Sequence, residues 1–253
     1  MSGRQAEDFA EHEVVWTPEK VSNLWNYYGS EPAYHTVFFA YRVGRRVARF
    51  IDRRIKLRRM RRILDFGCGR GDMTAALLQR AGKRQQLYGL DFSEKCVAEV
   101  EARFSGTEGF AGAERLPSAF DDDFFDLVVA TEVVEHLDDQ HLDQMLRDCH
   151  RMLRPGGFLV VTTPNDEDLP SARVLCPDCG GIFHPWQHMR SWTESSLRAE
   201  MEAYGFESTY SAAVSWGPLA VRWATLFKLA TKWSLVYFGR KSSSAPGAGR
   251  QGR

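Results

Sequence analysis

The sequence predicts an α/β protein built on a doubly wound, mostly parallel β-sheet. Short apolar runs alternate with longer segments in which apolar residues recur at helical spacing, and this alternation extends over residues 61–166. Strands that are separated by helices pair in parallel, and the helices cover both faces of the sheet. The contents of hydrophobic residues, 43%, and of charged residues, 26%, are typical of a globular protein.

Residues 1–60 are predicted to form an N-terminal helical cap. A first helix is expected to begin near Thr17 and Pro18, because proline is favoured at the first helical position, directly after a capping residue. Over residues 36–57 apolar residues recur at helical spacing, and arginines occupy the opposite face. This pattern predicts a longer amphipathic helix.

The core, residues 61–166, repeats a strand followed by a turn and a helix. The letters RILDFGCGRGDMTAALLQRAG indicate a buried strand, a glycine turn and a helix that ends near Gly82. The same order recurs in QLYGLDFSEKCVAEVEARF and in DLVVATEVVEHLDDQHLDQMLRDCHRML. In the latter segment the helix is expected to begin at TEVVEHL. A Pro-Gly-Gly turn then precedes the strand FLVVTTPN.

Residues 167–192 interrupt this alternation with a short insert that contains cysteine and histidine. Residues 193–241 are expected to complete the fold with a helix at 193–204, a strand at FESTYSAAV, a basic amphipathic helix at 217–232 and a final strand at SLVYFGRK. The tail, residues 242–253, is rich in serine and glycine and is predicted to be disordered.

A cytoplasmic location is expected. The N-terminal segment MSGRQAEDFAEHE is polar and acidic, which argues against a secretory signal, and no apolar run is long enough to predict a transmembrane helix. The five cysteines are an odd number, so a disulfide framework is not expected. The helix at 217–232 carries cations and apolar residues without an acidic residue. It could lie on an anionic membrane surface or pack on the sheet, and both alternatives stay open.

The glycine turn indicates a ligand site. Glycine occupies every second position, at Gly67, Gly69 and Gly71, in the connection between a strand and a helix. Glycine lets the backbone bend sharply and approach a ligand closely. Asp65 closes the strand, where its carboxylate could meet an ammonium group. Asp91 closes the next strand, about twenty residues past Gly71, the distance expected for a carboxylate that binds ribose hydroxyls. The glycine spacing is shorter than in a dinucleotide fingerprint, which argues against a nicotinamide oxidoreductase.

The segments LDFGCGRGD, YGLDFSEK, FDLVVATEVVEHL and LRPGGFLVVTTPN follow one another as in class I S-adenosylmethionine-dependent methyltransferases, which the chain resembles over residues 61–166. The resemblance implies a Rossmann-like seven-stranded sheet and S-adenosylmethionine as cofactor. It implies that the glycine turn holds the methionine end, that an aspartate holds the ribose, and that Phe92 and the loop GAERLP flank the adenine. Gly112 stands where many members carry an adenine-binding aspartate. The predicted cofactor-binding residues are Asp65, Gly67, Cys68, Gly69, Gly71, Asp91, Phe92, Ala113, Glu114 and Thr131.

Glu132, Glu135 and His136 are predicted catalytic residues, spaced to share one face of a helix. His136 would be a general base oriented by a carboxylate, or the three side chains would hold a divalent metal that lowers the pKa of acceptor hydroxyls. The motif Glu-x-x-Glu-His resembles that of quinone O-methyltransferases and of small-RNA 2′-O-methyltransferases. A structural alternative also stays open, because glutamate favours the first turn of a helix.

The insert contains CPDCGGIFHPWQH, which offers the thiols of Cys176 and Cys179 and the imidazoles of His184 and His188. Thiolates and imidazoles suit tetrahedral zinc, and the first three residues have the spacing of a zinc knuckle. We therefore predict a structural zinc site that stabilises an insert too short for its own core. Two alternatives stay open. The cysteines are a reduced pair in an ordinary loop, or a histidine of the insert joins the Glu-x-x-Glu-His motif as a further metal ligand.

The sequence therefore predicts a methyltransferase that acts on an oxygen of a small, lipid-linked or glycan-linked acceptor. Because the insert follows the end of a core strand, it is expected to cover the acceptor pocket. A metal-dependent enzyme similar to RNA 2′-O-methyltransferases is one alternative, and a non-catalytic adaptor that retains the fold is another. The net formal charge of zero and the lack of an aromatic stacking motif argue against nucleic acid as a partner.

Overall fold

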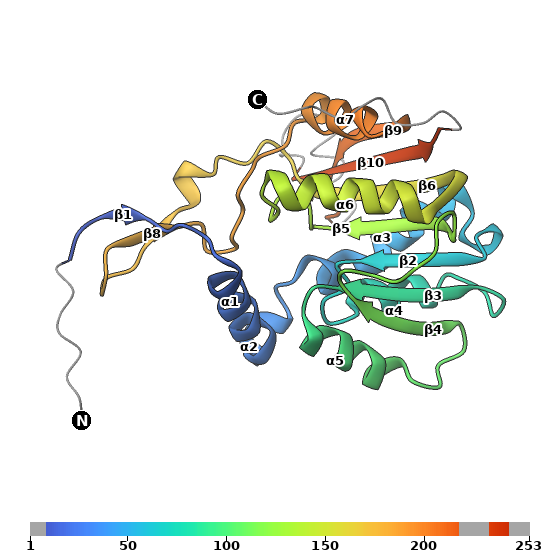
Figure 1. Ribbon diagram of the computed structural model, residues 1–253, viewed down its shortest axis with the longest axis horizontal. Helices are drawn as coiled ribbons and strands as arrows, with labels where there is room; N and C mark the ends of the chain where they lie inside the picture. Colours follow the sequence, from blue (N-terminus) through green and yellow to red (C-terminus); the bar gives the residue numbers. More distant parts are fainter. Residues whose placement is uncertain (1–8, 218–232, 243–253) are drawn as a thin grey trace.

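The computed structural model describes residues 9–217 and 233–242 of the chain. Its large sheet consists of β2 (Arg62–Phe66), β3 (Gln86–Asp91), β4 (Phe110–Arg115), β5 (Phe125–Thr131), β6 (Leu153–Pro164), β9 (Phe206–Val214) and β10 (Ser234–Lys241). The seven strands have the order β4-β3-β2-β5-β6-β10-β9 (Figure 1). β10 is antiparallel to both neighbours, and the other pairs are parallel. The predicted doubly wound, mostly parallel seven-stranded sheet is confirmed.

Helices cover both faces of this sheet. They are α3 (Phe39–Ile55), α4 (Asp72–Leu78), α5 (Glu94–Phe104), α6 (Asp139–Met152) and α7 (Glu194–Ala203). α6 and α7 pack on one face, where Leu146 and Leu197 are fully buried. α3 and α4 pack on the opposite face, where Ile51 and Leu77 are fully buried. α5 packs against β3 and β4. Each strand of the centre is therefore buried on both sides, which explains its continuous apolar sequence.

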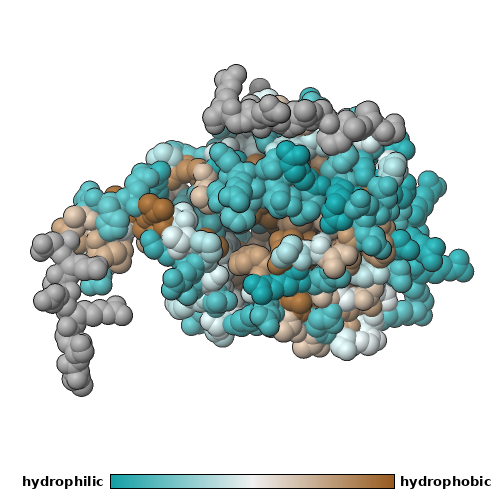
Figure 2. Space-filling model, viewed as in Figure 1, coloured by the Kyte–Doolittle hydropathy of each residue, from teal (hydrophilic) through white to brown (hydrophobic). Residues whose placement is uncertain are grey.

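A second, three-stranded sheet lies beside the domain (Figure 1). It contains β1 (His12–Glu13), β8 (Gly181–Phe183) and β7 (Val174–Leu175), in this order. β1 comes from the N-terminal segment and pairs in parallel with β8 of the insert. Hydrophobic residues gather where this sheet joins the rest of the molecule, whereas hydrophilic residues cover α6 (Figure 2). The insert thus forms a sheet only together with the N-terminal segment.

The helix α1 (Pro18–Ser30) lies between the small sheet and the domain, and α2 (Pro32–His35) follows it. α1 begins where proline predicts, with the side chain of Thr17 accepting a hydrogen bond from the backbone of Lys20. Trp25 Nε1 donates to Gln187 Oε1 at 2.8 Å, and the hydroxyl of Tyr28 donates to the carbonyl of Pro185 at 2.6 Å. These two bonds fasten α1 to the insert. Short 3-10 helices occur at η1 (Leu57–Arg59) and η2 (Pro170–Ala172).

One helix begins later than expected. The segment TEVVEHL was predicted to open a helix, but residues 132–138 form a loop and α6 begins at Asp139. Glu132 has a φ of +53°, a left-handed conformation that interrupts a right-handed helix. Asp138 caps α6 instead, because its side chain accepts a hydrogen bond from the backbone N–H of His141.

Two predicted segments lie outside the described residues. They are the basic amphipathic helix at 217–232, apart from Gly217, and the tail at 242–253, apart from Ser242. In the described part of the chain, every helix is too short or too polar to cross a membrane.

Candidate active site

The glycine turn between β2 and α4 has the backbone conformation that its sequence predicts. The φ angles are +71° at Gly67, +48° at Gly69 and +78° at Gly71, in the left-handed region that glycine adopts without strain. A Cβ at Gly67 would lie 2.6 Å from Val133 Cγ2, and a Cβ at Gly71 would lie 2.6 Å from Phe104 Cε2. The turn is therefore in direct contact with the loop that follows β5.

Two buried carboxylates flank the turn. Thr74 Oγ1 donates a 2.6 Å hydrogen bond to Asp65 Oδ2, whereas Asp65 Oδ1 is buried without a partner among the described residues. Burial raises the pKa of Asp65 to about 7. Asp91 accepts hydrogen bonds from the backbone N–H groups of Gly69 and Ser93, both at 2.9 Å. Asp91 thus also anchors the glycine turn, and the unpaired oxygen of Asp65 fits a ligand that carries an ammonium group.

The other predicted cofactor residues differ in how exposed they are. Phe92 follows β3 directly and has an exposed fraction of 46%. Ala113 and Glu114 lie on β4 beside the end of β3, rather than in a loop as expected. The side chain of Cys68 is buried against α5, so it is used for packing. Thr131 ends β5, and its hydroxyl is buried without a partner among the described residues.

Glu132, Glu135 and His136 lie on the loop between β5 and α6, so they do not share a helical face. Thr162 and Thr163 of β6 donate hydrogen bonds to the carboxylates of Glu132 at 2.8 Å and of Glu135 at 3.0 Å. Glu135 Oε1 lies 3.8 Å from His136 Nε2 and accepts no hydrogen bond from the described residues. Strand β6 therefore orients both glutamates, and one oxygen of Glu135 stays available.

Burial strongly shifts the pKa values of the three side chains Glu132, Glu135 and His136 on this loop. Burial raises the pKa of Glu132 to about 7. Burial and the nearby charge of Glu132 raise the pKa of Glu135 well above its ordinary value. Burial also lowers the pKa of His136 to about 3. The imidazole of His136 is therefore neutral near pH 7, whereas both glutamates keep their protons to higher pH than ordinary carboxyls do.

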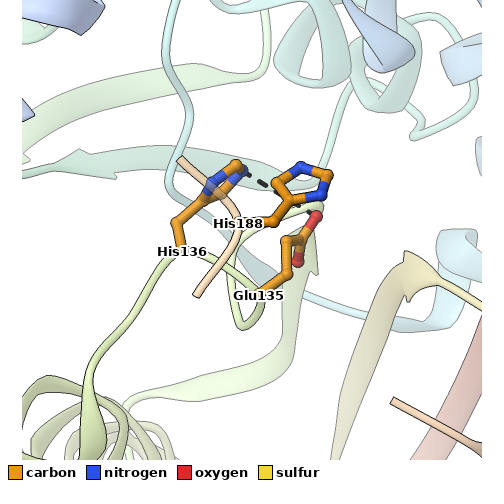
Figure 3. Close-up of side chains that lie close together, drawn as sticks. All are labelled: Glu135, His136 and His188. Carbon is orange, nitrogen blue, oxygen red and sulfur yellow. Dashed lines mark ion pairs between the residues drawn. The ribbon is translucent and has the colours of Figure 1, made fainter. Parts of the chain in front are cut away.

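The insert places His188 against this loop. Figure 3 shows Glu135 and His136 with the His188 ring beside them. The ring centroids of His136 and His188 lie 4.9 Å apart, and one ligating atom of each of Glu135, His136 and His188 lies within 4.8 Å of the others. His188 Nδ1 contacts Glu167 Oε2 at 2.5 Å. The carboxylate oxygens and imidazole nitrogens of these three residues are atoms that bind divalent metals.

The structure does not bring the four predicted zinc ligands together. In the described ranges, some side chains lie close enough together, in groups of three or more, to hold a metal ion. These groups include His184 and His188 but neither Cys176 nor Cys179. The cysteines lie in the turn between β7 and β8, whereas both histidines follow β8. A three-residue strand moves the chain by roughly 10 Å, which explains the separation. Zinc binding by the insert stays a prediction.

The cysteine pair has other neighbours. Hydrogen bonds from the backbone N–H groups of Cys179 and Asp178 lower the pKa of the Cys176 thiol, as suits a thiolate ligand. His12 of β1 lies opposite Gly181 in the small sheet. A Cβ at Gly181 would lie 3.4 Å from the sulfur of Cys179 and 3.7 Å from His12 Nε2. The imidazole nearest to the pair in this sheet thus comes from the N-terminal segment.

Sequence reasoning missed three side chains of this site. Glu167 belongs to the acidic run NDED, which resembles a solvated loop. Gln187 donates from its amide to the carbonyl of His136 at 3.0 Å. Trp25 packs edge-on against His136, with ring centroids 5.0 Å apart. The signal for Gln187 was its place between two histidines, whereas Trp25 is too distant in sequence to be linked to the site by any local pattern.

The chain is similar to known methyltransferases. A family model described as a methyltransferase domain matches residues 39–211. The chain is 35% identical over 150 residues to a probable S-adenosylmethionine-dependent methyltransferase of Mycolicibacterium smegmatis, a match that covers 58% of the chain and 52% of that protein. It therefore spans about half the length of this relative. It is 32% identical over 173 residues to a ubiquinone biosynthesis O-methyltransferase of Sinorhizobium fredii, which covers 64% of the chain and 66% of that protein.

The fold is also that of solved methyltransferases. The 1,6-didemethyltoxoflavin-N1-methyltransferase of Burkholderia thailandensis, solved with bound S-adenosylhomocysteine, superposes with a TM-score of 0.64 at 18% identity. This superposition covers 92% of the chain and 93% of that structure. The match of the family model over most of the chain, the strand order and the glycine turn agree with one another. The chain therefore belongs to the class I S-adenosylmethionine-dependent methyltransferases.

Proposed function

We propose that the chain transfers a methyl group to a hydroxyl oxygen of a small acceptor that binds beside Glu135, His136 and His188. One observation carries this proposal. The loop with Glu135 and His136 contacts the glycine turn through Val133, so the imidazoles and the available carboxylate oxygen lie next to the cofactor site. The ubiquinone biosynthesis O-methyltransferase of Sinorhizobium fredii supports transfer to oxygen.

The cofactor side of the site supports the roles that the sequence predicts. The unpaired buried oxygen of Asp65 suits the ammonium group of S-adenosylmethionine, and Asp91 lies at the end of β3, where a carboxylate can bind ribose hydroxyls. When bound, the cofactor supplies a methyl group on a sulfonium, and the electron pair of the broken C–S bond passes to sulfur. The residues of the chain must align the acceptor oxygen with that methyl group and remove its proton.

The pKa of His136 favours a ligand role over a base role. A base with a pKa of about 3 holds a proton poorly at neutral pH, whereas a neutral imidazole is a good metal ligand. The unpaired Glu135 Oε1 and the nearby Nε2 of His136 fit a divalent cation held by Glu135, His136 and His188. Such a cation would bind the acceptor oxygen and lower the pKa of its hydroxyl. Glu132, whose pKa is about 7, suits the proton acceptor.

The acceptor class follows from this set of ligands. A divalent cation favours an acceptor with two adjacent oxygens, such as an ortho-diphenol or a vicinal diol. Lipid or glycan linkage of the acceptor and contact with a membrane stay part of the proposal. An RNA 2′-hydroxyl is the alternative acceptor, and methylation of a short RNA but not of diphenols would favour it. Failure of the protein to bind S-adenosylmethionine would instead favour an adaptor.

Cofactor binding is expected to release a proton from Asp65. In the free protein its pKa is about 7, because the carboxyl is buried, whereas an ammonium beside it favours the carboxylate. The apparent affinity for S-adenosylhomocysteine should therefore rise about fivefold from pH 6 to pH 7. Calorimetric titrations in two buffers of different ionisation enthalpy measure both the affinity and the released proton. Asp65→Asn should bind more weakly and without this pH dependence, and equal affinity of the wild type at both pH values would contradict the assignment.

Glu135→Gln is expected to lower the rate of methyl transfer at least about a hundredfold, without a change in affinity for S-adenosylhomocysteine. Glutamine preserves the shape and the hydrogen bond from Thr163, but it cannot become a carboxylate when a cation binds at the available oxygen. The assay follows labelled methyl transfer to a panel of ortho-diphenols, vicinal diols and amines, and elemental analysis measures bound metal.

The matched control for Glu135→Gln is Cys176→Ser in the small sheet, which should keep the transfer rate. It would lose only a metal that is bound by the cysteines. Wild-type turnover of the glutamine variant, or a product methylated on nitrogen, would contradict the proposed function.

A further inference from the structure

Glu167 connects two imidazoles at the inner end of the insert. Glu167 Oε2 lies 2.5 Å from His188 Nδ1, and Glu167 Oε1 lies 3.4 Å from His184 Nε2. The two rings are stacked with centroids 4.4 Å apart. His184 is buried, and His188 and Glu167 are partly buried. Both contacts are therefore largely shielded from water, and their donors and acceptors must match.

The backbone decides the tautomer of His184. The backbone N–H of His188 donates to His184 Nδ1 at 3.2 Å. His184 Nδ1 therefore carries the lone pair, and the proton of the neutral ring lies on Nε2, the nitrogen beside Glu167. A nitrogen that carries a proton is not a metal ligand. His184 Nε2 makes no hydrogen bond within the described residues, but it lies 3.4 Å from Glu167 Oε1 and turns its proton toward that carboxylate. Glu167, His184 and His188 together nevertheless have the spacing of a metal site.

The carboxylate in turn decides the tautomer of His188. An ionised carboxylate only accepts hydrogen bonds, so the 2.5 Å contact places the proton of the neutral His188 ring on Nδ1. The lone pair is then on Nε2. Histidine ligands in metal sites usually have this arrangement, in which the second nitrogen donates to a carboxylate. His188 belongs to the group with Glu135 and His136, and its Nε2 would be the nitrogen that can bind a cation there.

We propose that Glu167 is a positioning residue which, supported by His184, holds His188 in the Nδ1–H tautomer and so makes Nε2 of His188 a ligand for a divalent cation at Glu135 and His136. The part that concerns the cation rests on the proposed function, whereas the part that concerns the tautomer does not. Glu167, in the acidic run after β6, thus acts on the site through His188 rather than through the acceptor.

Glu167→Gln tests the tautomer directly. An amide has one accepting and one donating group. His184 cannot exchange its tautomer, because its Nδ1 accepts from the backbone. The amide oxygen therefore pairs with His184, and the amide nitrogen donates to His188 Nδ1. We expect ¹⁵N–¹H correlation spectra of ring-labelled, metal-free protein to show His188 protonated on Nδ1 in the wild type and on Nε2 in the variant. A wild-type His188 protonated on Nε2 would overturn the inference without any variant.

Cobalt(II) titration, followed by absorption and calorimetry, tests the effect on the cation. Glu167→Gln should weaken Co²⁺ binding by about 10–100-fold. Glu167→Asp, which keeps the charge, should keep the Nδ1–H tautomer and bind Co²⁺ more tightly than the glutamine variant. Asp166→Asn, a change at the exposed neighbouring carboxylate, should equal the wild type in both measurements.

The outcomes separate the two proposals. The same His188 tautomer in wild type and Glu167→Gln would overturn the positioning role, as would unchanged Co²⁺ affinity of the glutamine variant. If the tautomer changes as expected but the wild type binds no Co²⁺, the positioning role is supported and the cation of the proposed function is refuted.

Discussion

Asp91→Ala is expected to weaken the binding of S-adenosylhomocysteine by about 10²–10⁴-fold. A hydrogen bond to a charged group contributes about 1.5–3 kcal/mol, and a ribose offers two hydroxyls to this carboxylate. The variant also removes the acceptor for the backbone N–H groups of Gly69 and Ser93, so the glycine turn loses an anchor. Calorimetric titration measures the affinity.

Glu94→Ala is the matched control for Asp91→Ala. Glu94 is a neighbouring carboxylate whose side chain has an exposed fraction of 87%, so the control should bind like the wild type. Thermal unfolding separates loss of affinity from loss of fold. An Asp91→Ala protein that is folded and binds with wild-type affinity would exclude Asp91 from the cofactor site.

Phe125→Ala is expected to lower the free energy of unfolding by about 3–5 kcal/mol. The ring of Phe125 is fully buried at the start of β5. It meets the rings of Phe120 and Phe124 at centroid distances of 4.9 Å and that of Tyr88 at 5.5 Å. Truncation leaves a cavity that this aromatic cluster cannot fill without moving the strands around it. Denaturant unfolding measures the change.

Phe92→Ala tests whether burial explains the effect of Phe125→Ala. With an exposed fraction of 46%, Phe92 should change stability by about 0.5 kcal/mol or less, although it flanks the predicted adenine site. Equal destabilisation by the two variants would show that the aromatic cluster is not the source of the stability.

The sheet and the cofactor side were predictable because their signals are local. The central strands are apolar runs, and the turn from Gly67 to Gly71 needs left-handed backbone at three alternate positions. Asp65 and Asp91 could be placed because parallel strands end at the same edge of a sheet. The anchoring of the glycine turn by Asp91 was not predictable, because it depends on a hydrogen bond between the end of β3 and the turn after β2.

The acceptor side was predicted less well because its contacts are not local. The helical spacing of Glu132, Glu135 and His136 suggested a helix, but the left-handed Glu132 and the cap at Asp138 delay α6. The spacing of the cysteines and histidines suggested one zinc site, but the strand β8 separates the two pairs. A histidine of the insert does lie beside His136, as one alternative anticipated, whereas Glu167 carried no signal that separates it from a solvated acidic loop.

The bonds of Trp25 to Gln187 and of Tyr28 to Pro185 span 162 and 157 positions of the chain. The cofactor side uses one contiguous stretch, from β2 to β5, and a ribosome completes it early. The N-terminal segment contacts a late insert, so this part of the molecule is completed only after the core has been synthesised. On the proposed function, substitutions in α1 or the insert would change the acceptor without altering the residues predicted to bind the methyl donor.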